Sequence, residues 1–159
     1  MEIMLKKLIQ KREGFTLIEI LVVIGIIAVL ATIVIIAINP ARQFAQARDT
    51  QRTSNLNTIL NAIGQNIADN RGIFTCSGSE FTLPGSATVI RASIAAADIY
   101  DCLVPTYMPA MVCDPVEGED CDDSGQYNTA YTVSMATSGR ITIAAPETEL
   151  ANPDLSVTR

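Results

Sequence analysis

The sequence predicts an α+β protein in which a long N-terminal helix packs on a small antiparallel β-sheet. An apolar run without any charged residue covers positions 20–41, and an amphipathic stretch follows at 41–71. Two alternating segments at 127–135 and 140–144 follow later in the chain. Apolar residues spaced three and four apart are typical of a helix, whereas strict alternation is typical of a half-buried strand.

The chain begins with a basic leader, residues 1–14, which holds four basic and two acidic residues and ends in Gly14. A secretory signal also starts with basic residues, but its apolar run is shorter and its cleavage site follows that run. The uncharged run here has 22 residues, and a membrane-spanning helix needs about 20. We therefore expect a spanning helix at 15–39, with its N-terminus in the cytoplasm because the basic flank stays inside.

Glu19 is a carboxylate at the start of this apolar helix. An acid inside a membrane is costly unless it is paired, so it indicates a functional role. The alternative is that Glu19, near the helix end, reaches the lipid headgroups. A cut after Gly14 would create a free α-amine on Phe15, four residues before Glu19. The carboxylate of one subunit could then neutralise the amine of its neighbour and set the register between them.

Residues 6–38 resemble the class III leader and N-terminal helix of type IV pilins and of type II secretion pseudopilins. The matching residues are Lys-Arg-Glu-Gly-Phe-Thr-Leu-Ile-Glu at positions 11–19. The resemblance implies a pilin-like fold, cleavage between Gly14 and Phe15 by a prepilin peptidase, N-methylation of Phe15 and a role for Glu19 in subunit assembly. Pro40 departs from the pattern, because family members usually carry this proline a few residues earlier.

The resemblance also implies a function and a location. The chain would be a structural subunit of a type IV pilus-like filament, or alternatively a pseudopilin of a type II secretion or competence system. It would stay in the cytoplasmic membrane before joining an extracellular or periplasmic filament. Its partners would be copies of itself, related pilins, prepilin peptidase, membrane lipid and an inner-membrane assembly platform with its ATPase. A plain single-span anchored domain is the remote alternative.

The amino-acid composition argues against two classes of function, direct nucleic-acid binding and catalysis. Without the leader, seven basic and fifteen acidic residues remain, a net charge of −8, and the chain contains no His. Nucleic-acid binding depends on clustered Lys and Arg, so we expect no direct nucleic-acid partner. No nucleophile with an adjacent base is recognisable, which argues against an enzyme.

An amphipathic helix is expected at 40–72. Its apolar positions recur at spacings of three and four, which predicts a buried stripe. These positions are Leu56, Ile59, Leu60, Ile63 and Ile67. The charged residues are expected on the other faces. They are Arg42, Arg48, Asp49 and Arg52. Gly72 is the expected C-cap.

Pro40 allows two interpretations. It removes a backbone donor and clashes with the preceding turn, which predicts a kink or break over positions 36–40. Alternatively, it begins a second helix at its first turn, where proline is tolerated.

Residues 73–159 are expected to form a loop-rich, extracytoplasmic β-hairpin region. A short strand is expected at 88–90, a short helix at 93–103, and a hairpin from the two alternating segments with 137–139 as its turn. The tail from position 146 onward is expected to be coil or a last edge. Residues 106–115 resemble a stretch that many pseudopilins carry before their final hairpin.

Four cysteines, Cys76, Cys102, Cys113 and Cys121, all lie after the apolar run. An even number in an exported domain favours disulfides, with three connectivities open. We prefer Cys76–Cys102 and Cys113–Cys121, because the second closes a short acidic loop. Zinc is the rival use, but the chain has neither a CxxC pair nor a histidine.

The acidic loop at 114–125 is a calcium candidate, since calcium takes six to eight oxygen ligands. Its spacing is not that of an EF-hand, and a solvated acidic surface is the alternative. The resemblance adds support, because major pseudopilins often hold calcium in this region. The candidate ligands are Asp114, Glu117, Glu119, Asp120, Asp122 and Asp123. No other cofactor is expected.

Overall fold

The chain divides between Pro40 and Ala41 into two units, and the computed structural model describes residues 14–151 and 153–159. The described part of the first unit contains one helix, α1 (Leu17–Ile38). The second unit contains almost all of α2 (Pro40–Asp69), the short helix α3 (Tyr100–Leu103) and six strands. The expected α+β class is confirmed. The expected leader lies outside the described residues except for Gly14.

Helix α1 is apolar on every face. Its 22 residues are mostly Ile, Val, Leu and Ala, and none of them is buried. Asn39 follows with left-handed backbone angles, φ 49° and ψ 79°, and ends the helix. Pro40 is then the first residue of α2. The structure thus has the expected break within positions 36–40, and Pro40 begins the second helix. At this first position the missing N–H of proline costs no helical hydrogen bond.

Helix α2 buries the expected stripe. Leu56, Ile59, Leu60 and Ile63 are almost fully inaccessible to solvent, and Ile67 is half-buried. Burying each such side chain contributes about 1.5–3 kcal/mol. The stripe also continues toward the start of the helix. Its further members are Ala45, Asp49 and Arg52, all buried. The prediction that Asp49 and Arg52 lie on the other faces of the helix is therefore wrong, because both bond to chain segments packed on this face.

The C-terminal cap of α2 begins at Arg71, one residue before Gly72, which was the expected C-cap. Arg71 takes the left-handed position with φ 60°, and Gly72 follows with φ 91°. The Gly72 N–H then donates to the Ile67 carbonyl at 2.8 Å. This six-to-one bond is the closing bond of a Schellman cap, whose left-handed residue comes one position earlier.

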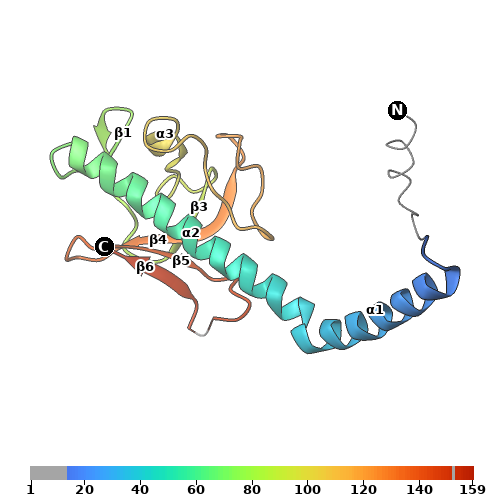
Figure 1. The fold of residues 1–159 in the computed structure, drawn as a ribbon. Helices are drawn as coiled ribbons and strands as arrows, with labels where there is room; N and C mark the ends of the chain where they lie inside the picture. The colour runs from blue at the N-terminus through green and yellow to red at the C-terminus, as the bar shows by residue number, and fades with distance from the viewer. Residues whose placement is uncertain (1–13, 152) are drawn as a thin grey trace, which may run out of the picture. The chain divides into compact units, whose positions relative to one another are not determined.

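A four-stranded antiparallel sheet covers the apolar stripe of α2 (Figure 1). Its order is β3 (Thr88–Arg91), β4 (Asn128–Met135), β5 (Ile141–Ala145) and β6 (Leu155–Thr158). Burial alternates along β4 and β5, so Tyr131, Val133, Ile141 and Ile143 join the core. The expected strand and hairpin are confirmed, and the tail forms the last edge strand of the sheet. Four strands with a helix on one face can be stable, whereas a lone hairpin is marginal.

The region between the helix and the hairpin holds the smaller elements. Strands β1 (Thr75–Cys76) and β2 (Ser79–Glu80) form a separate ladder, which lies near α3 and the end of α2 (Figure 1). The helix expected at 93–103 is mostly absent, because only Tyr100–Leu103 is helical. The Ile99 N–H bonds to the Tyr127 hydroxyl at 3.0 Å instead of to a helix carbonyl. That hydroxyl donates in turn to Asp98 at 2.9 Å. The hydrogen bond from Ile99 to Tyr127, the residue directly before β4, thus replaces the backbone bond that a helix would form.

Candidate assembly site

Gly14, Phe15 and Thr16 lead into α1 in an exposed, non-helical segment. Thr16 is the N-cap residue, with extended backbone angles, and Phe15 just before it is 79% exposed. No part of the described chain covers the bond between Gly14 and Phe15. The bond between Gly14 and Phe15 thus lies outside the helix.

Glu19 and Thr16 form a reciprocal capping box. The Glu19 N–H donates to Thr16 Oγ1 at 3.2 Å, and the Thr16 N–H donates to Glu19 Oε2 at 3.2 Å. The Thr16 hydroxyl also lies 3.2 Å from the same carboxylate oxygen. Such a box satisfies backbone donors that the first helical turn leaves unpaired, and the positive end of the helix dipole favours the carboxylate. Thr16 was not among the residues predicted from the sequence, although Thr-x-x-Glu before an apolar run is a recognisable capping signature.

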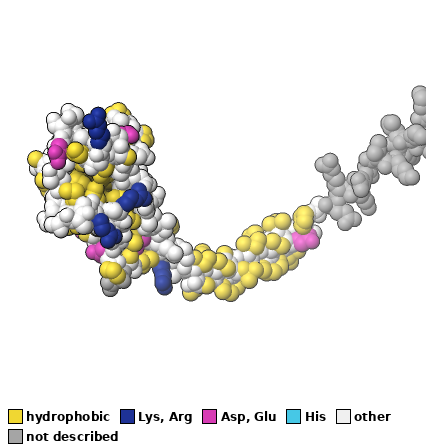
Figure 2. Space-filling model, turned by 90° about the vertical axis from the view of Figure 1, so that its left-hand side faces the viewer, with side chains coloured by type: hydrophobic (Ala, Val, Ile, Leu, Met, Phe, Trp, Pro, Cys, Tyr) yellow, Lys and Arg dark blue, Asp and Glu magenta, His cyan; other side chains and the backbone are white. Residues whose placement is uncertain are grey.

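Hydrophobic side chains cover the described length of α1 (Figure 2). In the described residues this is the one helix long and apolar enough to cross a membrane, with a mean hydropathy of 3.3. Gly25 lacks a side chain and leaves a shallow apolar groove between Leu21, Val22, Ile26 and Val29. The Thr32 hydroxyl donates to the Ala28 carbonyl at 2.9 Å, so even this polar group is satisfied within the helix. Such a surface suits lipid or the apolar face of another helix.

A buried ion cluster lies at the start of α2, centred on Arg52, which is 1% exposed. Arg52 binds Asp114 through two parallel bonds, Nε to Oδ2 at 2.6 Å and Nη2 to Oδ1 at 3.1 Å. Its Nη1 donates to Asp49 at 2.9 Å and to Glu149 at 3.1 Å. Arg48 binds Glu149 through a second pair of bonds. We call these five residues the Arg52 cluster.

Backbone donors complete the Arg52 cluster. Asp114 accepts from the N–H groups of Val116 and Glu117 at 2.9 and 3.1 Å. Asp49 accepts from those of Glu149 and Leu150 at 3.1 and 2.8 Å. In the described residues no buried side-chain nitrogen or oxygen lacks a partner. The cluster thus joins α2 to two loops that are far away in the sequence.

The same contacts shift the pKa values of the carboxyl groups. Burial alone would raise the pKa of Asp114, but hydrogen bonds from Arg52 and from two backbone N–H groups hold it below its usual range. Burial would also raise the pKa of Asp49, which backbone N–H groups and Arg52 lower. The Arg48 hydrogen bond, followed by that of Arg52, lowers the pKa of Glu149 to about 2. All three groups are therefore charged at neutral pH.

The sequence contained a signal for this cluster. Ala45, Asp49, Arg52 and Leu56 follow one another at spacings of four, three and four, so they continue the apolar stripe on one helix face. A charged pair in register with a core stripe indicates a buried pair, since charges are almost never fully buried alone.

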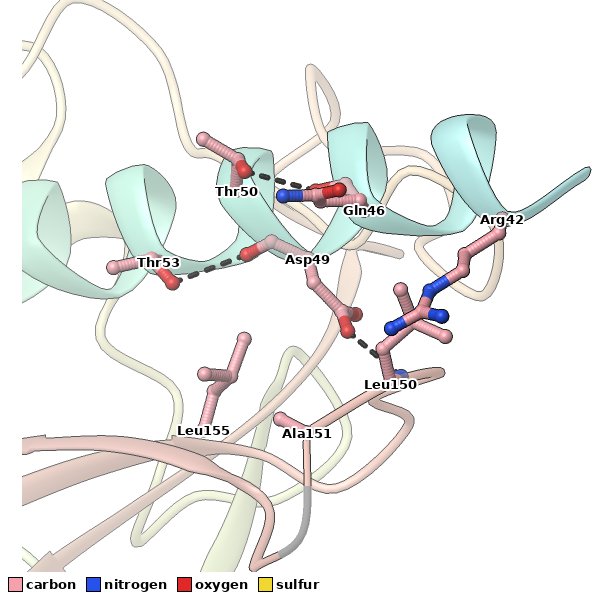
Figure 3. A pocket seen from close by; sticks show the side chains of 8 residues that line it. All are labelled: Arg42, Gln46, Asp49, Thr50, Thr53, Leu150, Ala151 and Leu155. Carbon is pink, nitrogen blue, oxygen red and sulfur yellow. Dashed lines mark hydrogen bonds between the residues drawn. The ribbon is translucent and has the colours of Figure 1, made fainter. Parts of the chain in front are cut away.

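A groove of about 360 Å³ lies beside the cluster, between α2 and the 150–155 segment (Figure 3). The helix contributes Arg42, Gln46, Asp49, Thr50 and Thr53. The opposite wall is apolar and consists of Leu150, Ala151 and Leu155. The hydroxyls of Thr50 and Thr53 already donate to helix carbonyls. The groove thus combines a polar and charged helix wall with an apolar wall.

Residues 9–35 match the family model described as the prokaryotic N-terminal methylation motif. This match covers Gly14, Phe15, Thr16 and Glu19 together with most of α1. The chain carries the class III leader of type IV pilin and pseudopilin precursors. The pilin-type motif indicates a structural subunit rather than an enzyme family. No curated protein and no solved structure matches the chain.

Two disulfides join the cysteine pairs that were preferred from the sequence. Cys76 bonds to Cys102 with their Cα atoms 4.3 Å apart, and Cys113 bonds to Cys121 with their Cα atoms 6.2 Å apart. The first connects β1 to α3. The second closes part of the acidic loop, and Asp114, next to Cys113, binds Arg52.

Two carboxylates of the acidic loop, Asp114 and Asp123, make hydrogen bonds within the chain. In the part of the chain that the structure describes, no group of three or more acidic, Cys or His side chains could hold an ion. Asp114 is bound to Arg52, and Asp123 accepts hydrogen bonds from Gly125 and Gln126. The backbone of Glu119 forms a bridge with Asn128.

Proposed function

We propose that this pilin-type precursor is a structural subunit of a type IV pilus-like filament. The observation that carries the proposal is the exposed Gly14–Phe15 segment placed directly before a helix that is apolar on every face. Cleavage there by prepilin peptidase leaves the apolar helix on the mature chain, where an ordinary secretory signal would lose it. N-methylation of Phe15 then follows.

Assembly moves α1 from lipid to other copies of the same helix. Extraction from the membrane is offset because the apolar side chains exchange lipid contacts for helix contacts, and small residues such as Gly25 allow close approach. Head-to-tail contacts of this kind do not close, so they give an open helical polymer. The proposed partners are copies of the chain, related pilins, prepilin peptidase and an inner-membrane assembly platform with its ATPase.

Glu19 is proposed to guide docking by binding the Phe15 amine of an adjacent subunit. The capping box supports this role because it holds the carboxylate at the helix start, beside the terminus that cleavage would create. Only Oε2 accepts hydrogen bonds within the box, which leaves Oε1 to accept an amine. Thr16 acts as a positioning residue for Glu19.

A pseudopilin of a secretion or competence system is the second candidate. The resemblance of residues 106–115 to a pseudopilin stretch favours it. The two candidates differ in the length and location of the filament rather than in the chemistry of the subunit.

Shearing filaments from native cells and sequencing the N-terminal peptide by mass spectrometry tests the proposal. N-methyl-Phe15 in abundant sheared material supports a major pilin. The same peptide found only in membranes supports the pseudopilin candidate. An uncut chain that still begins at Met1 would contradict both and leave a single-span anchored domain.

A further inference from the structure

One aromatic side chain of the second unit is largely in solvent. Phe44, near the start of α2, is 63% exposed, which makes it the most exposed large apolar side chain in the described residues of this unit. A Phe side chain can bury about 150–250 Å², and aromatic residues are enriched at contacts between proteins. Phe44 therefore offers a projecting apolar group to a partner.

The groove described above lies on the other side of the same helix (Figure 3). Thr53 belongs to its helix wall and follows Phe44 by nine residues, which is about two and a half turns. The two side chains therefore point away from each other across α2. Ala45 and Asp49 are buried between them and hold the helix on the rest of the unit. Phe44 thus cannot fill the groove of its own chain.

The groove has the size and the lining that an aromatic ring needs. Its volume is about 360 Å³, and an apolar cavity of about 150 Å³ already takes a benzene molecule. The wall opposite the helix consists of Leu150, Ala151 and Leu155, and Leu150 is 47% exposed. Arg42 lines the groove as well, and a guanidinium group is attracted to the face of an aromatic ring.

The two sides of α2 also differ in charge. Arg42 gives the groove side an exposed positive charge. Arg48 follows Phe44 by one turn and so lies on the same side of the helix as Phe44, where it already binds a carboxylate of its own chain. The recess beside Arg48 adds two exposed acids, Glu117 and Glu147. The groove side is thus basic and the Phe44 side is acidic, so the two sides are electrostatically complementary.

We propose that Phe44 of one copy inserts into the groove of the next copy, and that Arg42 of the second copy faces the acidic recess of the first. The contact joins two different surfaces, so it is heterologous and can continue from copy to copy. The inference rests on the proposed filament function. It adds a contact between second units to the packing of the apolar helices.

Photochemical cross-linking tests the proposed contact. The full chain is produced with benzoylphenylalanine, a photoreactive aromatic residue, in place of Phe44, in cells that assemble filaments from it. Cross-linked dimers are isolated on a denaturing gel, so that every link analysed joins two copies. Trypsin cleaves after Arg140 and releases the peptide 141–159, which carries the apolar wall of the groove. Benzoylphenylalanine at Ile73, which is 44% exposed and does not line the groove, is the control.

We expect dimers in which position 44 of one copy is joined to the peptide 141–159 of the other, and fewer such links from position 73. Filaments that form while position 44 joins only other peptides would overturn the inference and leave the proposed function intact. The same holds if position 44 gives no more of this link than position 73. If the processed wild-type chain forms no filament at all, the proposed function fails, and the inference fails with it.

A second experiment blocks the groove. Thr50 lines it, whereas Thr58 is exposed on the same helix outside it. The two hydroxyls donate to carbonyls one turn earlier, at 2.8 and 2.9 Å, so Thr50→Trp and Thr58→Trp are matched in their effect on the helix. We expect Thr50→Trp to lower the amount of sheared subunit by at least about tenfold and Thr58→Trp to leave it near the wild-type amount. Equal amounts from the two variants, both shown to be folded by circular dichroism, would contradict the proposed contact.

Discussion

At the scale of single residues, Gly14 is expected to be required for processing. It lies at the proposed cut in an exposed segment, where no described side chain approaches it within 4 Å. Any effect of a Gly14→Leu substitution on cleavage therefore comes from fit to the peptidase rather than from loss of fold. We expect the leader to stay attached, as measured by the mass of the chain in membranes. Normal processing of this variant would count against the proposed cut.

Glu19 is expected to act in assembly and not in cleavage. A Glu19→Ala chain should be processed normally and yet yield far fewer filaments, because the neighbour's amine loses its partner in a medium of low dielectric. Electron microscopy and the amount of sheared subunit measure the outcome. A matched Thr16→Val variant separates the two roles of the box. It keeps the carboxylate but loses the capping hydroxyl, which typically stabilises a helix by about 1 kcal/mol. Wild-type filament yield from Glu19→Ala would refute the pairing.

Arg52 is the residue whose removal should destabilise the second unit most. An Arg52→Met variant leaves Asp49 and Asp114 buried without their cation, and breaking a buried pair in this way costs about 3–5 kcal/mol. Urea unfolding of the full chain in detergent, followed by near-ultraviolet circular dichroism, measures the loss. Arg48→Met is the control, because Arg48 is on the surface and exposed pairs contribute little. Equal losses in the two variants would contradict the central role of Arg52.

At the scale of elements, the disulfide Cys113–Cys121 closes part of the acidic loop, and this loop is joined to α2 through Asp114 and Arg52. The loop begins at Asp114, which Arg52 already holds, so calcium binding depends on the remaining acids. We keep calcium as a proposal for Glu117, Glu119, Asp120, Asp122 and Asp123. Calcium should raise the thermal midpoint of unfolding, whereas magnesium should not, because magnesium sheds its water less readily. The Glu119→Gln/Asp122→Asn variant is the control, and calcium should leave its thermal midpoint unchanged. If calcium also leaves the thermal midpoint of the wild-type chain unchanged, the calcium proposal is wrong.

Helix α1 and the sheet illustrate two different sources of element stability. An isolated helix of ordinary composition is marginal in water, and α1 has no buried residue in its own unit. In the proposed function, lipid or neighbouring helices stabilise it. The sheet obtains its stability from α2, since Leu56, Ile59 and Ile63 form one cluster with Tyr131, Val133 and Ile143. Strand β6 shows the same dependence, because its apolar residues pack on the core only after the chain returns to β5.

At the scale of the whole molecule, the Arg52 cluster should make the stability of the fold depend on pH. The pKa values of Asp49, Asp114 and Glu149 are lowered in the folded state. Such groups stabilise the fold above their unfolded pKa of about 4, and this contribution is lost as the pH falls through the folded values, to about 2 for Glu149. We expect the thermal midpoint to drop between about pH 4 and pH 2.

The Arg52→Met variant provides the control for this acid dependence. Its buried carboxylates lose their cation, so acid should relieve their unfavourable charge. The difference in thermal midpoint between the wild type and the variant should therefore shrink as the pH falls. A difference that stays constant over this range would show that the cluster does not carry the acid sensitivity.

The sequence by itself determined the features that depend on local patterns. The leader motif, the long apolar helix, the stripe from Leu56 to Ile67 and the hairpin all follow from spacing and hydropathy, which act between neighbours in the chain. The capping box at Thr16 was equally local and could have been found. Only the tertiary structure decided which charges are buried. Arg52 meets Asp114 and Glu149 from 62 and 97 positions away, and no periodicity along one segment reports a partner on another. The same reason explains why the helix expected at 93–103 gave way to the bond with Tyr127, and why Leu150 lies beside the start of α2.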